Sequence, residues 1–323
     1  MKLTREILGN YLMIEDLSDS EIQRAFENMG IHAEGNSPFQ PAIPENRPDL
    51  MSFLGLARTL GAALGRQIRE PDCPVNESCC GSIFEHADVD TPSESCLRFS
   101  ARMAVNCRMI PSPDFLQRAL RSQGMIPRNC VQDLAAWVSL EYGVPVQVLD
   151  ARTLPEGSLL IRDAFPSEEA GGIPLPEGFP VFSDENYELL FPVGWQDPDL
   201  PPDAAEVLLC SGVYDSAVMS SFSPGYQMDP LATVPALNRL GCLMQRFSLG
   251  EILDGIIDSL NYVPQPRYLP FPQNLSAEIA GRLQILGFRE EAEGLRVPSF
   301  RQDIREHQDL LREIDRLKAC TEL

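Results

Sequence analysis

The chain reads VPSFRQDI at residues 297–304 and DLLREI at residues 309–314. Pro298 excludes a regular helix at this point and favours an extended residue before it. Three carboxylates follow at Asp303, Asp309 and Glu313, and the last two are four residues apart, on one face of a helix. Two like charges at this spacing cost about 0.2–0.5 kcal/mol unless a cation offsets them. The stretch therefore predicts a turn and then a helix whose acids are neutralised either by neighbouring arginines or by a metal ion.

Composition limits the classes of protein to which the chain can belong. It has 323 residues, 44% of them hydrophobic, which predicts two or three domains with a sizeable core. The net charge of −21 argues against DNA, non-specific RNA binding and anionic membranes. No apolar run approaches the ~18 residues of a membrane span. Nine scattered cysteines without a CxxC pair or a signal peptide indicate reduced thiols in a cytoplasmic protein.

The periodicity of apolar residues predicts an α+β fold with several modules rather than a doubly wound sheet. A capping box at Ser18 and Glu21 starts one helix, and Asn46-Arg47-Pro48-Asp49 starts another that ends at Gly65. Further expected helices cover 112–120, 131–141, 276–286 and 307–320. Expected strands cover 97–105, 144–149 and the pair around 288 and 295–297. Short strands and turns are expected in 151–245, helices from 249, and a linker at 66–95.

Four stretches recur together, in order, in one family. They are NRPDL at 46–50 with GLAR at 55–58, PSPDFL at 111–116, VQD at 131–133 with LEYG at 140–143, and LGF at 286–288 with the VPSFRQDI motif. With them the chain resembles the N-terminal half of the β subunit of phenylalanyl-tRNA synthetase. The resemblance implies an N-terminal α+β module at 1–65, the linker, a central mixed α/β tRNA-editing-like domain at 96–245 and a small module at 246–323. The chain has no room between Gly35 and Glu45 for the family's tRNA-binding OB fold.

The resemblance also places an editing pocket, which in the family hydrolyses tRNA mischarged with tyrosine. The polar pocket positions of the family fall on Ala135, Ala136, Gln147 and Cys210. Glutamine cannot exchange a proton near neutral pH as histidine does, and alanine cannot hydrogen-bond a substrate hydroxyl. No catalytic residue is therefore expected. The alanines either pack a helix or line an altered pocket that binds an amino-acid-like ligand. A nucleophilic Cys210 is a further reading, although buried cysteine usually acts as a small hydrophobe.

A magnesium ion shared with the α subunit is implied at four acids of the family, and this chain matches three of them: Asp303, Asp309 and Glu313. Arg312 stands at the fourth position. Three carboxylates with water suit magnesium, but Arg312 brings a competing cation. The alternative is a solvated helix face whose acids are neutralised by Arg305, Arg312 and Arg316.

No GxxxxGK[ST], GxGxxG, GxSxG or HExxH motif occurs, so the chain has no ATP site of its own. The expected function is that of a β-subunit-like protein that acts in tRNA aminoacylation with an α subunit, meets tRNA only within that complex and does not edit. The alternative is a free-standing degenerate paralogue that binds an amino acid or regulates a protein partner.

Overall fold

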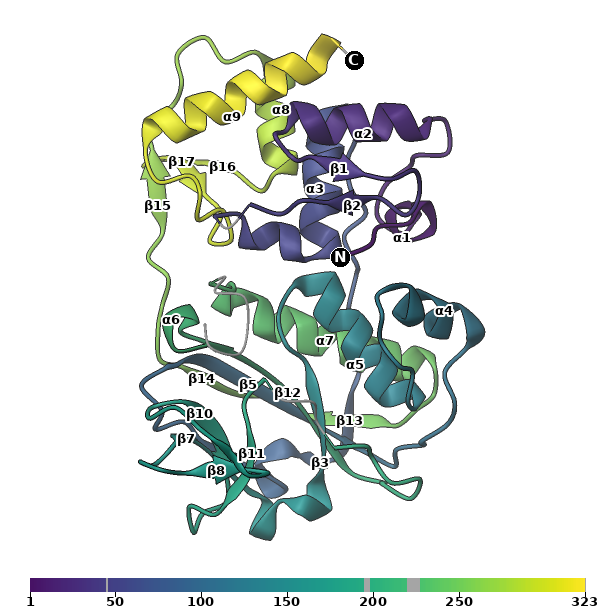
Figure 1. Cartoon of the computed structure of the whole chain (residues 1–323), viewed down its shortest axis with the longest axis vertical. Helices are drawn as coiled ribbons and strands as arrows, with labels where there is room; N and C mark the ends of the chain where they lie inside the picture. Colours follow the sequence, from purple (N-terminus) through teal and green to yellow (C-terminus); the bar gives the residue numbers. More distant parts are fainter. Residues whose placement is uncertain (45, 195–197, 220–226, 323) are drawn as a thin grey trace. The chain divides into compact units, whose positions relative to one another are not determined.

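The computed structural model describes residues 1–44, 46–194, 198–219 and 227–322. The chain divides into two compact units, drawn in Figure 1. The first comprises Met1–Pro71, Leu140–Gly143 and Pro264–Leu323, and the second comprises Asp72–Ser139 and Val144–Val263. In the described part of the chain, no helix combines the length and apolar character needed to cross a membrane. The expected α+β class is confirmed, since helices and largely antiparallel sheets occur in separate layers.

The first unit joins the two ends of the chain. Its helices are α1 (Arg5–Gly9), α2 (Asp19–Asn28), α3 (Phe53–Leu64), α8 (Ala277–Ile285) and α9 (His307–Ala319). Its strands are β1 (Ala33–Glu34), β2 (Gln40–Pro41), β15 (Arg267–Leu269), β16 (Arg289–Glu291) and β17 (Gly294–Val297), the last three in the order β15-β17-β16. Helix α3 packs on α2 and α8, and α9 packs on α8 and α2. The module expected at 1–65 thus shares one unit with residues 264–323, whereas residues 246–263 of the expected C-terminal module belong to the second unit.

The start of α3 differs from the predicted continuous helix. A 3₁₀ turn, η1 (Pro48–Met51), comes first, and Ser52 in extended conformation caps α3 by accepting from the Gly55 amide. Gly55 is required because a Cβ there would lie 1.9 Å from the Asp49 carbonyl oxygen. Ser52 thus caps α3, and the segment 46–49 expected to begin this helix precedes it. The capping box of α2 at Ser18 and Glu21 is confirmed.

The second unit is built from two packed sheets. The larger has the strand order β3-β13-β5-β12-β6, with β14 also paired to β5, and the smaller has the order β11-β10-β7-β4. The strands of the larger sheet are β3 (Glu77–Ser82), β5 (Cys96–Val105), β6 (Gln147–Asp150), β12 (Val207–Tyr214), β13 (Glu251–Asp254) and β14 (Ile257–Leu260). Those of the smaller sheet are β4 (Asp88–Asp90), β7 (Ser158–Asp163), β10 (Pro180–Ser183) and β11 (Leu189–Pro192). A hairpin of β8 (Glu169–Ala170) and β9 (Ile173–Pro174) completes the strands.

The core of this unit draws apolar side chains from both sheets, among them Phe99 of β5, Ile161 of β7 and Phe182 of β10. Helix α7 (Thr233–Arg246) packs on β5, β12 and β13. The remaining helices are α4 (Asp114–Ser122), α5 (Cys130–Tyr142) and α6 (Ser216–Met219), with short 3₁₀ turns elsewhere. The larger sheet therefore lies between a helical layer and the smaller sheet, as Figure 1 shows.

Three predictions for this unit were wrong. The linker at 66–95 contributes β3 and β4 to the two sheets, and the polar sequence of β3 carries no apolar alternation. Helix α7 lies in the range expected to hold strands, and its Pro235 falls in the first turn, where proline is tolerated. The helix expected from 249 is the strand pair β13 and β14, which turns at Gly255 with a φ of +86°.

Candidate functional site

Five buried charged side chains meet in the first unit: Arg47, Asp49, Arg301, Asp303 and Glu313. Arg47 donates from Nε and Nη2 to the two Asp49 oxygens, both at 2.8 Å. Arg301 makes the same two bonds to Asp303, also at 2.8 Å. The two pairs face each other, since Arg47 Nε lies 3.8 Å from Asp303 Oδ1. An Arg-x-Asp sequence thus folds twice into the same bidentate clamp.

The turn after β17 holds Arg301 in place. The Arg301 amide donates to the Pro298 carbonyl and the Ile304 amide to the Arg301 carbonyl, at 3.0 and 3.3 Å. The guanidinium of Arg267 on β15 donates to the carbonyls of Arg301 and Ile304. The Arg301 guanidinium also lies 5.7 Å from the centre of the Phe288 ring. The proline turn predicted from the sequence therefore positions an arginine in the core.

Glu313 of α9 completes the cluster. Its Oε1 lies 3.0 Å from Arg301 Nη1, an ion pair whose angle does not suit a hydrogen bond, and its Oε2 accepts from Arg316 at 3.1 Å. The charges of Arg47, Arg301 and Arg316 balance those of Asp49, Asp303 and Glu313. We call these six residues the arginine–carboxylate cluster. Because nothing remains unbalanced, the carboxylates need no further cation.

The pKa shifts in the cluster follow from this pairing. Burial acts to raise the pKa of Asp303, but the hydrogen bonds and charge of Arg301, together with the charge of Arg47, hold it below its usual range. Burial acts to lower the pKa of Arg301, but Glu313, Asp303 and Asp49 hold it above its ordinary value. Both groups therefore stay charged near neutral pH.

Asp309 has a different task. One of its oxygens accepts the backbone amides of Arg305 and Glu306, both at 3.0 Å, at the first turn of α9. The other faces Arg312 Nη1 at 3.3 Å. These amide bonds lower the pKa of Asp309. Asp309 is therefore the third helical residue of a capping box, and Glu306 is the N-cap.

The three carboxylates as arranged do not fit a magnesium ion. Each oxygen of Asp303 and Glu313 faces a guanidinium, and Asp309 is engaged by amides and Arg312. Magnesium needs oxygen ligands in a near-octahedral arrangement, and a guanidinium between two of them excludes it. Among the described residues, no group of three or more His, Cys, Asp and Glu side chains is placed to hold a metal ion. Magnesium binding here stays a prediction from the resemblance.

The four positions at which the resemblance places an editing pocket, Ala135, Ala136, Gln147 and Cys210, lie in the second unit, and we call them the former editing pocket. Gln147 of β6 and Cys210 of β12 are cross-strand partners, and the Cys210 thiol faces the Gln147 carbonyl at 3.8 Å. Cys210 is 1% exposed and belongs to the core between the two sheets. Ala135 is buried and Ala136 half-buried in the middle of α5. The structure thus brings Gln147 and Cys210 together and gives Cys210 apolar surroundings.

Tyr214 is a polar residue of this region that the sequence did not single out. Its ring lies over Gly212, where a Cβ would come within 2.5 Å of the hydroxyl oxygen. The hydroxyl is buried and has no hydrogen-bond partner among the described residues. Burial, with Cys96 and Cys210 nearby, raises the pKa of Tyr214 well above its ordinary value. Burial likewise raises the pKa of the Cys96 thiol to about 12. These groups remain protonated and do not supply a nucleophile or a base near neutral pH.

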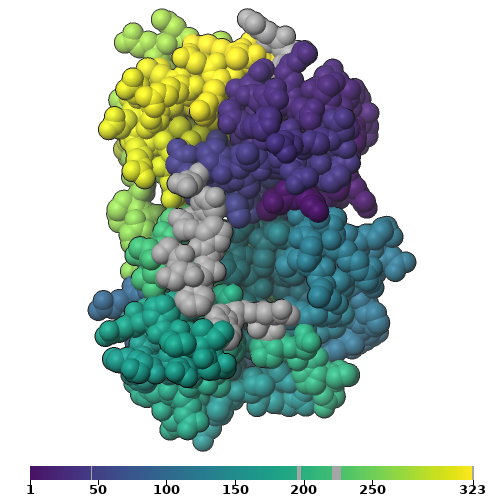
Figure 2. Space-filling model, in the orientation of Figure 1, coloured from purple at the N-terminus to yellow at the C-terminus, as the bar shows by residue number. Residues whose placement is uncertain are grey.

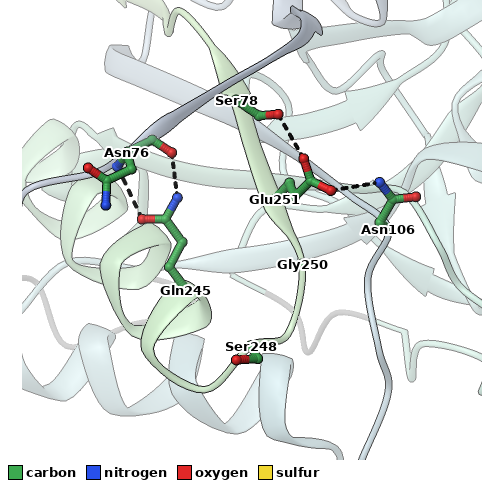
Figure 3. Close-up of a pocket in the computed structure, with 7 residues that line it drawn as sticks. All are labelled: Asn76, Ser78, Asn106, Gln245, Ser248, Gly250 and Glu251. Carbon is green, nitrogen blue, oxygen red and sulfur yellow. Dashed lines mark hydrogen bonds between the residues drawn. The ribbon is translucent and has the colours of Figure 1, made fainter.

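A polar pocket of about 580 Å³ opens elsewhere in the second unit (Figure 3). Its lining consists of Asn76, Ser78, Asn106, Gln245, Ser248, Gly250 and Glu251. Glu251 accepts from Ser78 Oγ at 2.8 Å and from Asn106 Nδ2 at 3.1 Å, and these bonds lower its pKa. Gln245 exchanges two hydrogen bonds with the Asn76 backbone. The lining residues come from segments far apart in the sequence, so no sequence motif predicted the pocket. Glu251 is the ionisable residue of this lining, which suits binding rather than acid–base chemistry.

Comparisons with known proteins bear on both units. Residues 95–248 match the family model of the B3/4 domain. The chain is 25% identical to the phenylalanine–tRNA ligase β subunit of Clostridium acetobutylicum over 313 residues, 85% of this chain and 39% of that protein. The β subunits of Geobacillus kaustophilus and Geobacter metallireducens are 26% and 28% identical, over 91% and 87% of this chain and 40% and 39% of those proteins. The chain thus spans about two fifths of the length of these curated relatives.

A solved structure supports the fold. The crystal structure of an N-terminal fragment of the phenylalanyl-tRNA synthetase β subunit from Pyrococcus horikoshii matches with a TM-score of 0.51 and 17% identity, over 99% of both chains. The resemblance inferred from the four motifs is therefore confirmed: this chain is similar to the N-terminal part of phenylalanine–tRNA ligase β subunits, and its residues 95–248 match the B3/4 domain.

Proposed function

We propose that the chain acts in phenylalanine charging, in the cytoplasm, as a β-subunit-like protein that docks on an α subunit. The observation that carries the proposal is similarity to β subunits across 85–91% of the chain, which includes segments of both units. A role confined to the B3/4 domain would leave the first unit unexplained. In this role tRNA meets the chain only within the complex, in keeping with the net charge of −21.

The contribution of the chain in this proposal is structural. The arginine–carboxylate cluster is neutral within itself and ties the turn after β17 to α9 and to the start of α3. The former editing pocket has lost the groups that hydrolysis needs, since two positions are alanine and Cys210 lies in the core. Both features support a subunit that positions partners rather than one that makes or breaks bonds.

Co-purification tests the docking. The full chain and the phenylalanine–tRNA ligase α subunit from the same organism are co-expressed, with a tag on the α subunit only. We expect a stable complex at micromolar concentration and faster phenylalanylation of tRNA than with the α subunit alone. No complex at that concentration would remove the proposal.

The absence of editing is tested separately. The tRNA for phenylalanine, mischarged with tyrosine, is incubated with the chain alone and with the complex. The tyrosine released is measured. We expect release at the rate of spontaneous hydrolysis. The complete ligase of Geobacillus kaustophilus serves as the comparison enzyme. Release well above background would show that the altered pocket still hydrolyses the ester.

The alternative function is that of a free-standing amino-acid-binding or regulatory protein. The net charge of −21 and the substitutions at Ala135, Ala136, Gln147 and Cys210 favour it. Melting of the chain is followed with phenylalanine, tyrosine and leucine added in turn. A rise with the aromatic amino acids only, together with failure to bind the α subunit, would establish the alternative. Unchanged melting across the set would count against it.

A further inference from the structure

Two aromatic side chains stand exposed on the smaller-sheet lobe of the second unit. Phe165 and Tyr187 are 50% and 55% exposed, and their ring centres lie 6.3 Å apart with the planes tilted by 44°. Phe165 follows β7, and Tyr187 lies in the turn between β10 and β11. Ile173, at the start of β9 in the same lobe, is 51% exposed. Figure 2 shows part of this lobe at the surface, in teal. We call the two rings the Phe165–Tyr187 platform.

A buried arginine joins the two turns that carry the rings. Arg162 is 3% exposed and donates to the Tyr187 carbonyl at 2.8 Å and to both Glu168 oxygens at 2.7 and 2.8 Å. Its guanidinium lies 4.3 Å from the centre of the Phe165 ring. One side chain thus joins the turn that carries Phe165 to the turn that carries Tyr187. One face of the Phe165 ring and the backbone of Tyr187 are therefore held in place before any partner arrives.

Tyr187 itself is strained. Its φ of +64° is in the left-handed region, which is unusual for a bulky residue and costs on the order of 1 kcal/mol or more. The conformation is held because the Tyr187 amide donates to the Asp184 carbonyl and the Asp184 carboxylate accepts the amides of Asn186 and Glu188. Strained backbone of this kind clusters at functional sites, so the exposed Tyr187 ring is a candidate contact for a ligand.

The surroundings of the platform are strongly acidic. Between residues 158 and 192 the only basic residue is Arg162, whose charge is matched by Glu168. The exposed acids of this range are Glu169, Glu177, Glu185 and Glu188. Carboxylates around aromatic faces repel phosphates and attract cations. The charge therefore favours a basic protein segment over a nucleic acid.

We propose that the Phe165–Tyr187 platform docks a basic segment of a partner protein. An arginine or lysine side chain lies over the exposed ring faces while the neighbouring carboxylates pair with flanking basic residues. Arginine is preferred because its planar guanidinium stacks on aromatic rings. The docking does not depend on the α-subunit role proposed above.

The test uses the full chain and fluorescent peptides in which glycine alternates with arginine, with lysine or with glutamine. Anisotropy is expected to show binding of the arginine peptide, weaker binding of the lysine peptide and none of the glutamine peptide. The double variant Phe165→Leu/Tyr187→Asn removes both rings. Leucine keeps apolar bulk at position 165, and asparagine tolerates the positive φ at position 187. We expect it to weaken arginine-peptide binding about fivefold to thirtyfold, since each exposed cation–π contact is worth about 0.5–1 kcal/mol and the variant removes two. A thermal melt of the variant confirms that it is folded.

The controls separate the platform from the overall negative charge. Glu185→Gln/Glu188→Gln removes two charges beside the rings, and Glu6→Gln/Glu27→Gln removes two exposed charges from the first unit. We expect a loss of affinity from the first pair that is at least twice that from the second. Equal losses from the two pairs, or a ring variant that binds the peptide like the unchanged chain, would overturn the proposal. Tighter binding of a fluorescent single-stranded RNA than of the arginine peptide, lost in the ring variant, would assign the platform to nucleic acid instead.

Discussion

The arginine–carboxylate cluster and the former editing pocket occupy positions where the resemblance places chemistry, and they differ in how they treat charge. In the cluster, Asp303 and Glu313 are retained and fully buried or nearly so, and arginines balance them. At the former editing pocket the side chains of Cys210, Ala135 and Ala136 carry no charge, and Cys210 packs in the apolar core. A buried charge persists only where a partner compensates its desolvation. The comparison teaches that one region is fixed by ion pairs and the other by packing.

The largest effect is expected from breaking the centre of the cluster. Arg301→Met keeps the length of the side chain but leaves Asp303 and Glu313 without their shared partner. Loss of one member of a buried ion pair costs about 3–5 kcal/mol. Urea unfolding followed by circular dichroism should show this loss in the first unit. Arg301 is 0% exposed, so solvent cannot take over its role.

A matched variant sharpens the result. Arg316 also pairs with Glu313, but its side chain is 43% exposed. Arg316→Met removes the same chemical group from this half-exposed position. We expect a cost of about 1 kcal/mol or less, as for solvent-accessible pairs. Similar costs for the two variants would mean that burial of Arg301 contributes nothing.

The second prediction concerns acid. Because the pKa of Asp303 is depressed in the folded protein, its contribution is present above its unfolded pKa of about 3.9 and is lost as the pH falls through the folded value. The difference in unfolding free energy between the unchanged chain and Asp303→Asn should therefore be largest near neutral pH and shrink below pH ~4. Asp315→Asn, at a 74% exposed side chain, is the control and should change little at any pH. If the difference in unfolding free energy stayed constant below pH ~4, protonation of Asp303 would not contribute to acid unfolding.

The local structure around the cluster could be predicted from the sequence, whereas the contacts between distant segments could not. Pro298, the α2 capping box and the spacing of α9 acids fixed local structure, because each acts within a few residues. The Arg-x-Asp pattern at 47–49 and 301–303 is a local signal for the two clamps, since each arginine pairs with the aspartate two residues after it. The meeting of Arg47 with Asp303 depends on packing between α3 and the C-terminal segment. Strand β3 was missed because it pairs through its backbone and carries no apolar alternation.

The third prediction concerns the core around the former editing pocket, where removal of a polar group is expected to stabilise the fold. The Tyr214 hydroxyl is buried without a partner among the described residues, so Tyr214→Phe removes an unsatisfied polar atom and keeps the ring. We expect an unfolding free energy that is unchanged or higher by up to about 1 kcal/mol. Differential scanning calorimetry of the second unit's transition measures it. Cys210→Ala, which removes a buried sulfur from the same core, is the control and should destabilise. A clear loss in Tyr214→Phe would reveal a hydrogen bond that stabilises the region.

The smallest effect is expected from magnesium. Because the six charges of the cluster cancel and Arg301 lies between Asp303 and Glu313, the melting temperature of the unchanged chain should be the same in magnesium chloride and in EDTA. Arg301→Met supplies the matched case, since it leaves those two carboxylates without the guanidinium. If that variant binds magnesium, an ion concentration about five times Kd stabilises it by about 1 kcal/mol. A magnesium-dependent rise in the unchanged chain that Asp303→Asn abolishes would instead show that the ion displaces Arg301, and the cluster would then be a metal site held closed by an arginine.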